Sequence, residues 1–431
     1  MNIQSWGKLP KVDHSSISYI NPDSKFEFDD MHYLPYGLGR SYGDSCLNEN
    51  GNLIITEQLA DISHFDKETG ILVCGSGVSF KKVLKTIVKF GWFLPVVPGT
   101  QNVTIGGAIA NDIHGKNHHK SGSFGNFIKS FELLRSDGTI LNCSDSLNAD
   151  FFHATIGGMG LTGVILKVEI ELKRIQNAFI NTKTVKYNSL QEYWDISSDL
   201  ENQYEYTVSW IDCLMKNDGF RGVFLAGNHS EDTSINMNDD RKVLNLPFPI
   251  TPPISLVNNL SLKILNNTYF KLNKQSNNKL QHYRSFFFPL DVINNWNNAY
   301  GKRGFFQYQF VIPYDAGSTP IKKILEQIRN SRQVPGLGVL KNFGSVKSKG
   351  LMSFPREGVT LALDFANKGP KTLELFNKLD EIVLANNGAI YPAKDARMSS
   401  KVFSSGYENL EIFKHYIDPK FSSSFWRRVN K

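Results

Sequence analysis

The feature that most constrains this chain is a glycine-rich stretch at residues 98–125, PGTQNVTIGGAIANDIHGKNHHKSGSFG. It contains six glycines, three histidines and two lysines, with few bulky apolar side chains. A segment with so little apolar surface gains little from burial in a hydrophobic core. Glycine, which lacks a Cβ atom, lets the backbone approach a ligand closely. We therefore expect this stretch to lie against a large ligand, with VTIGGAIA forming a strand or the start of a helix.

Two shorter glycine-rich segments lie on either side of this stretch. The first, GLGRSYGD at 37–44, can aim backbone N–H groups, Arg40 and Ser41 at an anion. Its GxGxxxG spacing differs from the dinucleotide fingerprint GxGxxG, and no amphipathic helix follows, so a Rossmann fold is not supported. Alone, it is equally well explained as a structural turn. The second, GGMGLTG at 157–163, precedes a predicted strand, and the three segments together indicate one extended ligand across one domain.

The three histidines of the central stretch raise a metal site as an alternative. His114 and His118 are four residues apart, and His119 follows directly. Gly115 and Asn117 between them make a poor helix, and no cysteine completes a ligand set. We therefore expect no metal site in this segment.

Apolar periodicity places strands and helices in blocks along the chain. Residues 80–91, FKKVLKTIVKFG, are typical of an amphipathic helix that ends at its final glycine. Residues 128–143 indicate a hairpin with an Asp-Gly turn at 137–138. Blocks of this kind favour an α+β fold over a doubly wound parallel sheet. The region 229–282 is rich in Asn, Ser and Pro and lacks a clear pattern, which leaves open a mobile lid, a lipid-facing segment or an ordinary irregular excursion.

The composition limits where the chain can work. No apolar run approaches the roughly 18 residues of a membrane-spanning helix, and residues 1–11 lack the apolar region of a secretory signal. Four isolated cysteines fit a reducing compartment and predict no disulfide framework. The net charge of +7 comes without a nucleic-acid-binding motif. We expect a cytoplasmic protein with no nucleic-acid partner.

The C-terminal segment concentrates positive charge. Residues 420–431, KFSSSFWRRVNK, contain four basic and three aromatic residues and no acid. This composition is typical of a helix at a membrane interface. A C-terminal helix that packs its aromatic side chains on the core is the favoured interpretation of the segment alone, and both interpretations stay open.

Motifs along nearly the whole chain resemble those of the vanillyl-alcohol-oxidase-type flavoproteins, and among these the decaprenylphosphoryl-ribose 2′-oxidase family. The motif DIHGKNHH with its flanks is highly specific for this resemblance. The matching segments are SWG at 5–7, GLGRSYGD at 37–44, the stretch 98–126, FFHATIGGMGLTG at 151–163, FFPLD at 287–291, NNAYGKRGFFQYQFVIP at 297–313, VLKNFG at 339–344 and YPAKDAR at 391–397.

The resemblance implies the domain organisation and the cofactor. It implies a two-part FAD-binding domain, residues 1–178 and 389–431, with an antiparallel-sheet substrate-binding domain inserted at 179–388. Relatives with covalent FAD carry a histidine where this chain has Arg40, so the resemblance implies noncovalent FAD. The residues implied to bind FAD are Gly37, Leu38, Gly39, Arg40, Ser41, Tyr42, Gly99, Thr104, Ile105, Gly106, Gly107, His114, Gly115, Asn117, Gly163, Val164, Ile165 and Tyr391.

The resemblance also implies a substrate pocket. Gln307 and Gln309 alternate on one predicted strand and so face the same side, which the resemblance makes the pocket side. A buried lysine with a lowered pKa can accept the proton of a substrate hydroxyl, and Lys394 is the residue expected there. The residues implied to be catalytic are Lys394, His114 and Tyr42. Those implied to bind substrate are Lys116, Phe287, Gln307, Gln309, Lys341, Thr360, Ala362 and Lys394.

Three of these positions depart from the mycobacterial members of the family. Ala362 stands where those members carry a pocket cysteine, Thr360 replaces an asparagine, and Phe287 replaces a tyrosine. The polar contacts of the pocket are therefore expected to differ from those of the relatives.

The function implied is that of an FAD-dependent oxidoreductase that oxidises a secondary hydroxyl of a sugar. The implied substrate is a polyprenyl-phosphate-linked pentose, oxidised at the 2′ position in cell-envelope glycan synthesis. A short-chain reductase partner would then complete an epimerisation, at the inner face of the bacterial membrane and with peripheral membrane contact. A soluble alditol or aldonolactone oxidase of the same fold and a noncatalytic flavin-binding subunit stay open as alternatives.

Overall fold

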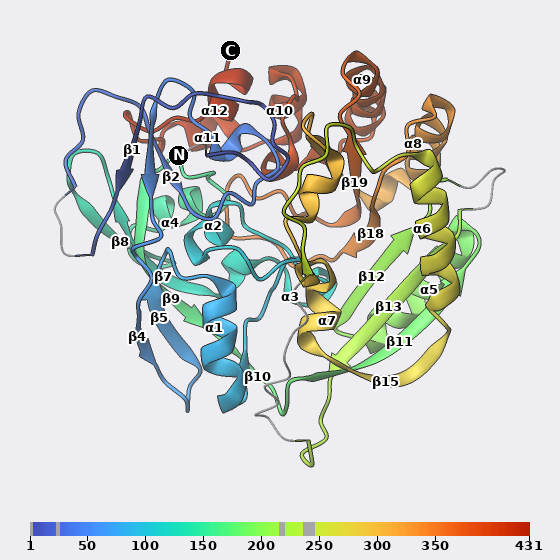
Figure 1. Cartoon of the computed structure of the whole chain (residues 1–431). Helices are drawn as coiled ribbons and strands as arrows, with labels where there is room; N and C mark the ends of the chain where they lie inside the picture. The colour runs from blue at the N-terminus through green and yellow to red at the C-terminus, as the bar shows by residue number, and fades with distance from the viewer. Residues whose placement is uncertain (1–2, 23–25, 215–219, 236–245) are drawn as a thin grey trace.

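The computed structural model describes residues 3–22, 26–214, 220–235 and 246–431. Its architecture is α+β, as expected, with two large antiparallel sheets lying side by side and helices over both (Figure 1). All four cysteines are free. Within the described ranges, no helix is long and apolar enough to cross a bilayer.

The first large sheet has five strands and lies among the glycine-rich segments. Its strands, in spatial order, are β4 (Ile62–Phe65), β5 (Ile71–Gly75), β9 (Val164–Glu171), β7 (Ile128–Leu134) and β8 (Ile140–Ser144). The predicted hairpin is confirmed as β7 and β8, and Gly138 in its turn has φ +85°. The predicted amphipathic helix is confirmed as α1 (Phe80–Ile87), which begins where the Ser79 side chain accepts the N–H of Lys82. Gly91 ends the helical segment in the left-handed region, at φ 78°.

Short elements connect this sheet to its surroundings. They are β6 (Trp92–Phe93), α2 (Ile105–Ala110), α3 (His118–Ser121), α4 (Ala149–Thr155) and β10 (Lys173–Arg174). The segment VTIGGAIA is thus the start of a helix, because the hydroxyl of Thr104 accepts the N–H of Gly107 and caps α2.

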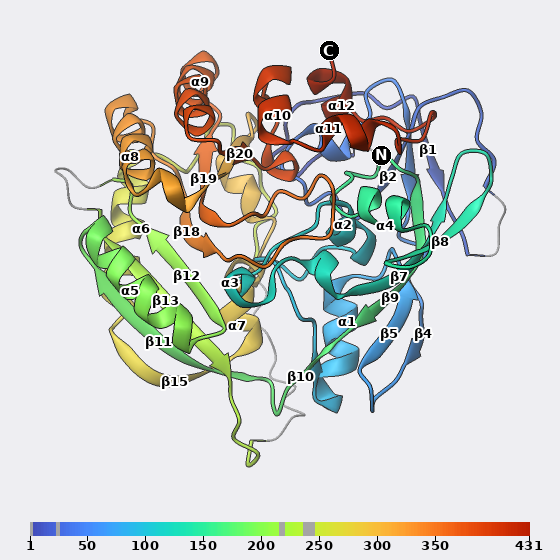
Figure 2. The same cartoon turned by 180° about the vertical axis from the view of Figure 1, so that it is seen from behind.

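The second large sheet has eight strands. In spatial order these are β15 (Ser276–His282), β11 (Phe179–Tyr187), β13 (Gly222–His229), β12 (Tyr206–Ile211), β18 (Gly338–Phe343), β19 (Gly358–Ala366), β17 (Phe305–Ile312) and β20 (Ala389–Ile390). Helices α5 (Leu190–Gln203), α8 (Thr319–Ser331) and α9 (Pro370–Ala385) cover one face (Figure 2). Tyr308, Phe310, Leu361 and Leu363 are buried against them. Alternation therefore leaves Gln307 and Gln309 on the opposite face.

The region 229–282 contains more regular structure than its sequence indicated. Helix α6 (Asn259–Leu272) leads into strand β15, so the described part of this region is not an irregular excursion. The Asn258 side chain caps α6 at Leu260 and Ser261, and Ser261 bonds back to the N–H of Asn258. Asparagines before and within this helix interrupt its apolar periodicity, so the sequence pattern did not predict it. The neighbouring elements are β14 (Leu246–Pro247), α7 (Tyr283–Phe287) and β16 (Ile293–Asn294).

The two ends of the chain are joined. A small parallel sheet of β1 (Ser16–Tyr19), β3 (Asn52–Ile55) and β2 (Tyr33–Tyr36) receives the C-terminal segment at its edge. The N–H of Tyr33 donates to the Lys420 carbonyl, and the N–H of Ser422 donates to the Tyr33 carbonyl, at 2.7 and 2.9 Å. Helices α10 (Ser400–Gly406), α11 (Leu410–Lys414) and α12 (Ser424–Val429) close this end.

The packing of α12 decides between the two interpretations of the C-terminal segment. Phe421, Phe425 and Trp426 are buried, and Arg428 forms ion pairs with buried carboxylates. The segment packs on the core, and the expectation that it offers an interfacial face to a membrane is wrong.

Candidate active site

The loop at residues 37–44 is held between the two ends of the chain. The N–H of Trp6 donates to the Ser41 carbonyl, and the N–H of Tyr42 donates to the Ala393 carbonyl, both at 2.8 Å. A Cβ atom at position 43 would overlap the backbone carbonyl of Asp395, so only glycine allows this approach. The loop therefore depends on the C-terminal segment for its shape.

Arg40 is fixed beside this loop. Its Nε donates to the Asn102 carbonyl at 3.0 Å, and its guanidinium lies 4.3 Å from the centroid of the Trp6 ring. Leu38 lies in the loop itself, between Gly37, which packs on Thr104, and Gly39, which has φ +60°. The structure thus brings the 37–44 loop and the 98–125 stretch together, as the sequence predicted.

The glycines of the 98–125 stretch fall into two classes. No protein atom lies within 4 Å of where a Cβ atom of Gly99 would be, and only the Thr104 hydroxyl approaches that of Gly107. Gly106 packs tightly on Ser76, and Gly115 packs on the Val97 carbonyl. Open backbone at Gly99 and Gly107 leaves space against which a bound group can lie. Packing between segments explains the other two glycines.

A buried carboxylate fixes the far side of this stretch. Asp112 Oδ2 accepts hydrogen bonds from Ser123 and Ser353 at 2.7 and 2.6 Å, and its Oδ1 accepts the N–H of Gly125 at 2.8 Å. Asn117 is likewise occupied, because its amide donates to the Pro95 carbonyl. Sequence reasoning missed this role of Asp112, although an acid inside a glycine-rich loop is a signal for such a bond.

His114 lies at the junction of the two sheets. Its Nε2 is 2.9 Å from the Gln309 amide nitrogen on β17, and its Nδ1 is 3.1 Å from Lys341 Nζ on β18. Burial, together with the positive charge of Lys341, holds the pKa of His114 well below its ordinary value. His114 is therefore a neutral imidazole. Its two partners, Gln309 and Lys341, are both residues that the sequence analysis expects to bind substrate.

Lys394, which is half-buried, lies in a second cluster next to this one. Its Nζ is 3.8 Å from the centroid of the Tyr42 ring. Burial lowers the pKa of Lys394 to about 8, against the attraction of the Asp364 carboxylate, which raises it. Burial also raises the pKa of Asp364 to about 7 and that of Tyr42 well above its usual range. The amine is thus poised to exchange a proton near neutral pH.

Asp364 is the main residue that sequence reasoning missed. Its Oδ1 accepts a 2.5 Å hydrogen bond from the Gln307 amide, while its buried Oδ2 has no hydrogen-bond partner. Asp364 lies on β19, two residues after Ala362 and four residues after Thr360. Because side chains alternate between the two faces of a strand, Asp364 shares the face of these two residues. That spacing was the signal. Thr360 itself is buried within reach of the Gln309 amide, at 3.2 Å.

Two more lysines approach the site from the 98–125 stretch and from β18. Burial lowers the pKa of Lys116 and that of Lys341 to about 7, and for Lys341 the nearby charges of Lys116 and Lys394 add to the effect. Lys116 donates to the Phe286 carbonyl at 2.5 Å, and Lys341 donates to the Gly115 carbonyl at 3.3 Å. Neither forms an ion pair with a carboxylate of the described chain. An anionic group bound beside them would restore their usual charge.

Other predicted residues also pack against protein partners. Phe287 is buried in an aromatic cluster with Phe93 and Tyr206, although Lys116 Nζ lies 5.9 Å from its ring centroid. The Tyr391 hydroxyl donates to the Asn111 carbonyl at 2.8 Å, and its ring stacks on Phe354. Gly163 turns the chain into β9, at Val164 and Ile165, with φ +139°.

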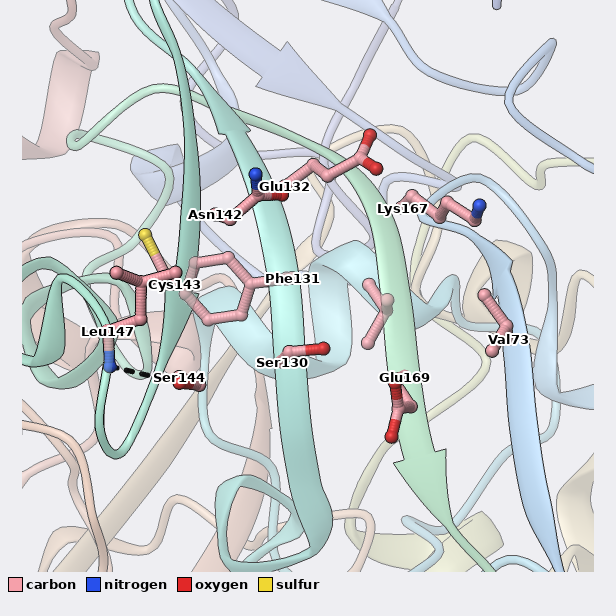
Figure 3. Close-up of a pocket in the computed structure, with 11 residues that line it drawn as sticks. Val73, Ser130, Phe131, Glu132, Asn142, Cys143, Ser144, Leu147, Lys167 and Glu169 are labelled. Carbon is pink, nitrogen blue, oxygen red and sulfur yellow. Dashed lines mark hydrogen bonds between the residues drawn. The ribbon is translucent and has the colours of Figure 1, made fainter.

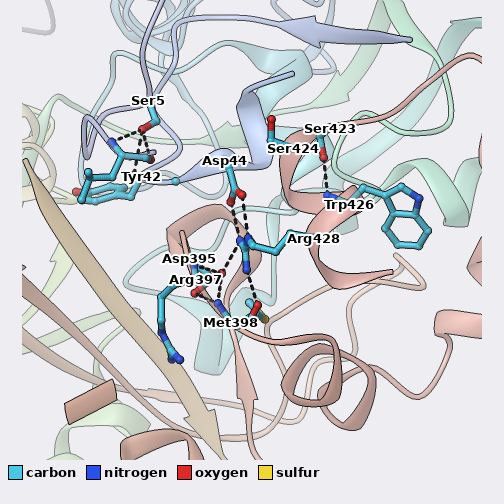
Figure 4. A network of polar contacts seen from close by, with 12 residues as sticks. Ser5, Tyr42, Asp44, Asp395, Arg397, Met398, Ser423, Ser424, Trp426 and Arg428 are labelled. Atoms are coloured by element: carbon cyan, nitrogen blue, oxygen red, sulfur yellow. Dashed lines mark hydrogen bonds and ion pairs between the residues drawn. The ribbon is translucent and has the colours of Figure 1, made fainter. Parts of the chain in front are cut away.

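A polar network centred on Arg428 includes Asp395, the residue that follows Lys394 in the chain (Figure 4). Arg428 donates to both oxygens of Asp44, at 2.9 and 2.6 Å, to Asp395 at 3.0 Å and to the Met398 carbonyl. The N–H groups of Arg397 and Met398 also donate to Asp395. This network anchors α12 and the 391–397 segment.

A hollow of about 300 Å³ lies elsewhere, on strands β5, β7, β8 and β9 (Figure 3). Its lining includes Ser130, Glu132, Asn142, Lys167 and Glu169. None of the candidate site residues takes part in it, so it belongs to a different surface. In the described part of the chain, no group of three or more His, Cys, Asp or Glu residues could hold a metal ion.

Comparison with known proteins shows which family the chain resembles. The FAD binding domain family matches residues 26–144, which include both glycine-rich loops. The chain is 34% identical to decaprenylphosphoryl-beta-D-ribose oxidase of Mycolicibacterium smegmatis, over 99% of this chain and 97% of that protein. It is 30% identical to D-lactate dehydrogenase of Archaeoglobus fulgidus over 32% of this chain and 31% of that protein. It is also 30% identical to L-gulonolactone oxidase of Mus musculus, over 31% and 30%.

Proposed function

Because the chain belongs to the decaprenylphosphoryl-beta-D-ribose oxidase family of FAD-dependent oxidoreductases, we propose that it oxidises the 2′ hydroxyl of a polyprenyl-phosphate-linked pentose. The open backbone at Gly99 and Gly107 fits the close approach of the cofactor. FAD, when bound, supplies the two-electron acceptor for oxidation of a carbinol. The chain's own residues position the sugar and manage its proton.

The observation that carries the proposal is the cluster of the buried Asp364 with the half-buried Lys394 and Tyr42. Oxidation of a secondary alcohol to a ketone removes one hydride and one proton. Lys394, with a pKa near neutrality, accepts the hydroxyl proton, and the Asp364 carboxylate stabilises the ammonium that forms. Gln307 holds Asp364 in place. Tyr42, whose phenol stays protonated, packs against the amine.

The pair Lys116 and Lys341 supports an anionic substrate. Both lysines are half-buried, both have a lowered pKa, and each donates only to neutral groups. A phosphate group would provide the missing counter-charge. Ala362, which pairs with Gln309 across β17 and β19, leaves room on the same face for a sugar.

The domain organisation and setting belong to the same proposal. Residues 1–178 and 389–431 form the FAD-binding domain, and 179–388 form an inserted substrate-binding domain that contains most of the eight-stranded sheet. Since Arg40 stands where relatives tether the flavin, FAD is held noncovalently. The ketone product then passes to a short-chain reductase partner, and the enzyme works at the cytoplasmic face of the inner membrane.

The test is anaerobic bleaching of the flavin. The purified, FAD-loaded enzyme is mixed with polyprenyl-phosphate pentoses or with free alditols, and the flavin absorbance is followed. We expect reduction by the lipid-linked pentose. Reduction by free alditols alone would show that the enzyme acts as an alditol oxidase. Reduction by neither substrate would contradict the proposed oxidase activity. Acid precipitation should release the FAD into the supernatant.

A further inference from the structure

Most leucine and isoleucine side chains of helix α6 point away from the protein core. Leu260, Ile264, Leu265 and Leu272 are 70%, 62%, 59% and 75% exposed. Asn266 instead points inward, where it is 6% exposed and its amide donates to Asp212 at 2.7 Å. A surface helix of a globular protein normally shows the reverse pattern. The outward face of α6 therefore has a role other than packing within this chain.

The exposed apolar side chains extend beyond the helix. Of the eighteen large apolar side chains that are exposed in the described chain, eleven lie between Leu246 and Ile293. We call the central part of this group the α6 surface. It consists of Ile250, Ile254, Leu256, Leu260, Ile264, Leu265 and Leu272. Such concentration marks an interaction site, because isolated exposed apolar residues would be spread over the molecule.

The charged residues of the segment 246–290, which contains α6, are all basic. No aspartate or glutamate occurs from residue 246 to residue 290. The same range contains Lys263, Lys271, Lys274, Lys279 and Arg284. By helical geometry, Lys263 and Lys271 lie on the same side of α6 as Leu260 and Ile264. Apolar side chains interleaved with lysine are typical of a helix in the interface of an anionic bilayer.

The α6 surface adjoins the substrate side of the eight-stranded sheet. The Tyr269 ring of α6 lies 4.9 Å from that of Trp210 on β12. Trp210 pairs with Val339, Val339 pairs with Ala362, and Ala362 pairs with Gln309. Residues paired in this way point to the same face of a sheet. Helix α6 therefore lies on the face that carries Gln309 and Ala362, opposite α5 (Figures 1 and 2).

We propose that the α6 surface docks on a bilayer that contains anionic lipids, with its leucines and isoleucines at the level of the headgroups. A second copy of the chain is a poorer occupant, because a symmetric contact would bring the lysines of two α6 helices together. Bilayer docking places the substrate face of the sheet beside the membrane. This use of the surface rests on the proposed function, since a polyprenyl chain could then stay in the bilayer while its sugar reaches Lys394.

The test measures vesicle binding of the full-length, FAD-loaded protein without substrate. Vesicles contain phosphatidylcholine either alone or with phosphatidylglycerol. The variant Leu260→Ser/Ile264→Ser is compared with the control Ile140→Ser/Leu147→Ser, whose two positions are 52% and 54% exposed on and near β8. We expect partitioning onto the anionic vesicles to fall about tenfold or more in the α6 variant and to stay unchanged in the control.

Salt and self-association complete the test. High salt should weaken the wild-type binding without abolishing it, because the apolar contribution is not screened. Equal binding by both variants, or no vesicle binding by the wild type, would overturn the proposal. So would a concentration-dependent dimer that only the α6 variant loses. Flavin bleaching is measured separately, so vesicle binding without sugar oxidation would contradict the proposed function and leave the docking surface standing.

Discussion

Lys394 and Asp395 are neighbours in the chain, yet they belong to two buried networks of opposite character. Asp395 shares Arg428 with Asp44, and in this network both carboxylates accept hydrogen bonds from a guanidinium whose pKa is raised by them. Lys394 faces Asp364, whose Oδ2 has no hydrogen-bond partner. The first network is fully paired, and the second leaves an amine and a carboxylate that both titrate near neutral pH.

The difference shows how a polar network that maintains the fold can be told from one that takes part in the reaction. A buried charge that is fully paired maintains the fold, because removing its partner leaves a charge without solvation. A buried charge that is incompletely paired is costly for the fold, and such a cost is typical of active sites. Substitutions in the two networks should therefore affect different measurements.

The largest effect is expected for Lys394→Met. Loss of a positioned proton acceptor should slow substrate-dependent flavin reduction by about 10²–10⁴-fold, while the FAD content and melting temperature change little. Stopped-flow absorbance under anaerobic conditions measures the rate. The control is Lys401→Met, an exposed lysine on α10. A wild-type rate in Lys394→Met would remove this residue from the mechanism.

The next effect is on stability. Arg428→Ala leaves Asp44 and Asp395 buried without their cation, and we expect it to lower the free energy of unfolding by about 3–5 kcal/mol. Arg427→Ala, which removes bonds to neutral oxygens of Asn48 and Glu49, should cost about 1 kcal/mol. Urea unfolding compares the two variants. If Arg428→Ala instead slowed flavin reduction at unchanged stability, the distinction between the networks would be lost.

The pH dependence gives a smaller effect. Flavin reduction should accelerate as the pH rises through about 8, because only the neutral amine of Lys394 accepts a proton. The carboxylate of Asp364 raises that pKa, so Asp364→Asn should move the profile to lower pH by about one unit. Rates measured from pH 6 to about pH 10 test the shift. A profile that keeps its position in Asp364→Asn would show that the two groups are not coupled.

The smallest effect is expected at the start of α12. The Ser423 hydroxyl accepts the N–H of Trp426 at 3.0 Å, so Ser423→Ala should cost about 1 kcal/mol of stability. Ser423→Thr retains the hydroxyl and should recover most of it. The rate of flavin reduction should be equal in both variants. A slower rate in either variant would show that α12 influences the reaction.

The sequence allowed much of the site to be predicted, since glycine-rich loops carry local constraints. The loops at 37–44 and 98–125 were expected to share a ligand, and the structure brings them together through the Arg40–Asn102 hydrogen bond and the packing of Gly37 on Thr104. Asp364 was missed because the strand around it is mostly apolar and buried on both faces, so a period of two is hard to see. Phe287, which is expected to bind substrate, packs in an aromatic cluster beside Lys116, and its contact with a substrate stays a prediction.

Helix α6 escaped prediction for a related reason. Its inward face carries Leu262 and Asn266, and its outward face carries leucine and isoleucine. Sequence patterns assume that apolar residues face the protein core. A helix whose apolar face is turned toward another medium breaks that assumption, and only the three-dimensional arrangement reveals it.

The joining of the two chain ends has a consequence for how the enzyme is made. The loop at 37–44 is synthesised long before its backbone partner Ala393 and before Phe421, which lies at the sheet edge. Domains fold as their residues emerge, so the eight-stranded sheet can assemble almost completely while the loop still lacks its neighbours. The loop at 37–44 therefore reaches its final shape only after residue 421 has been made, and a flavin that depends on this loop cannot be held before then.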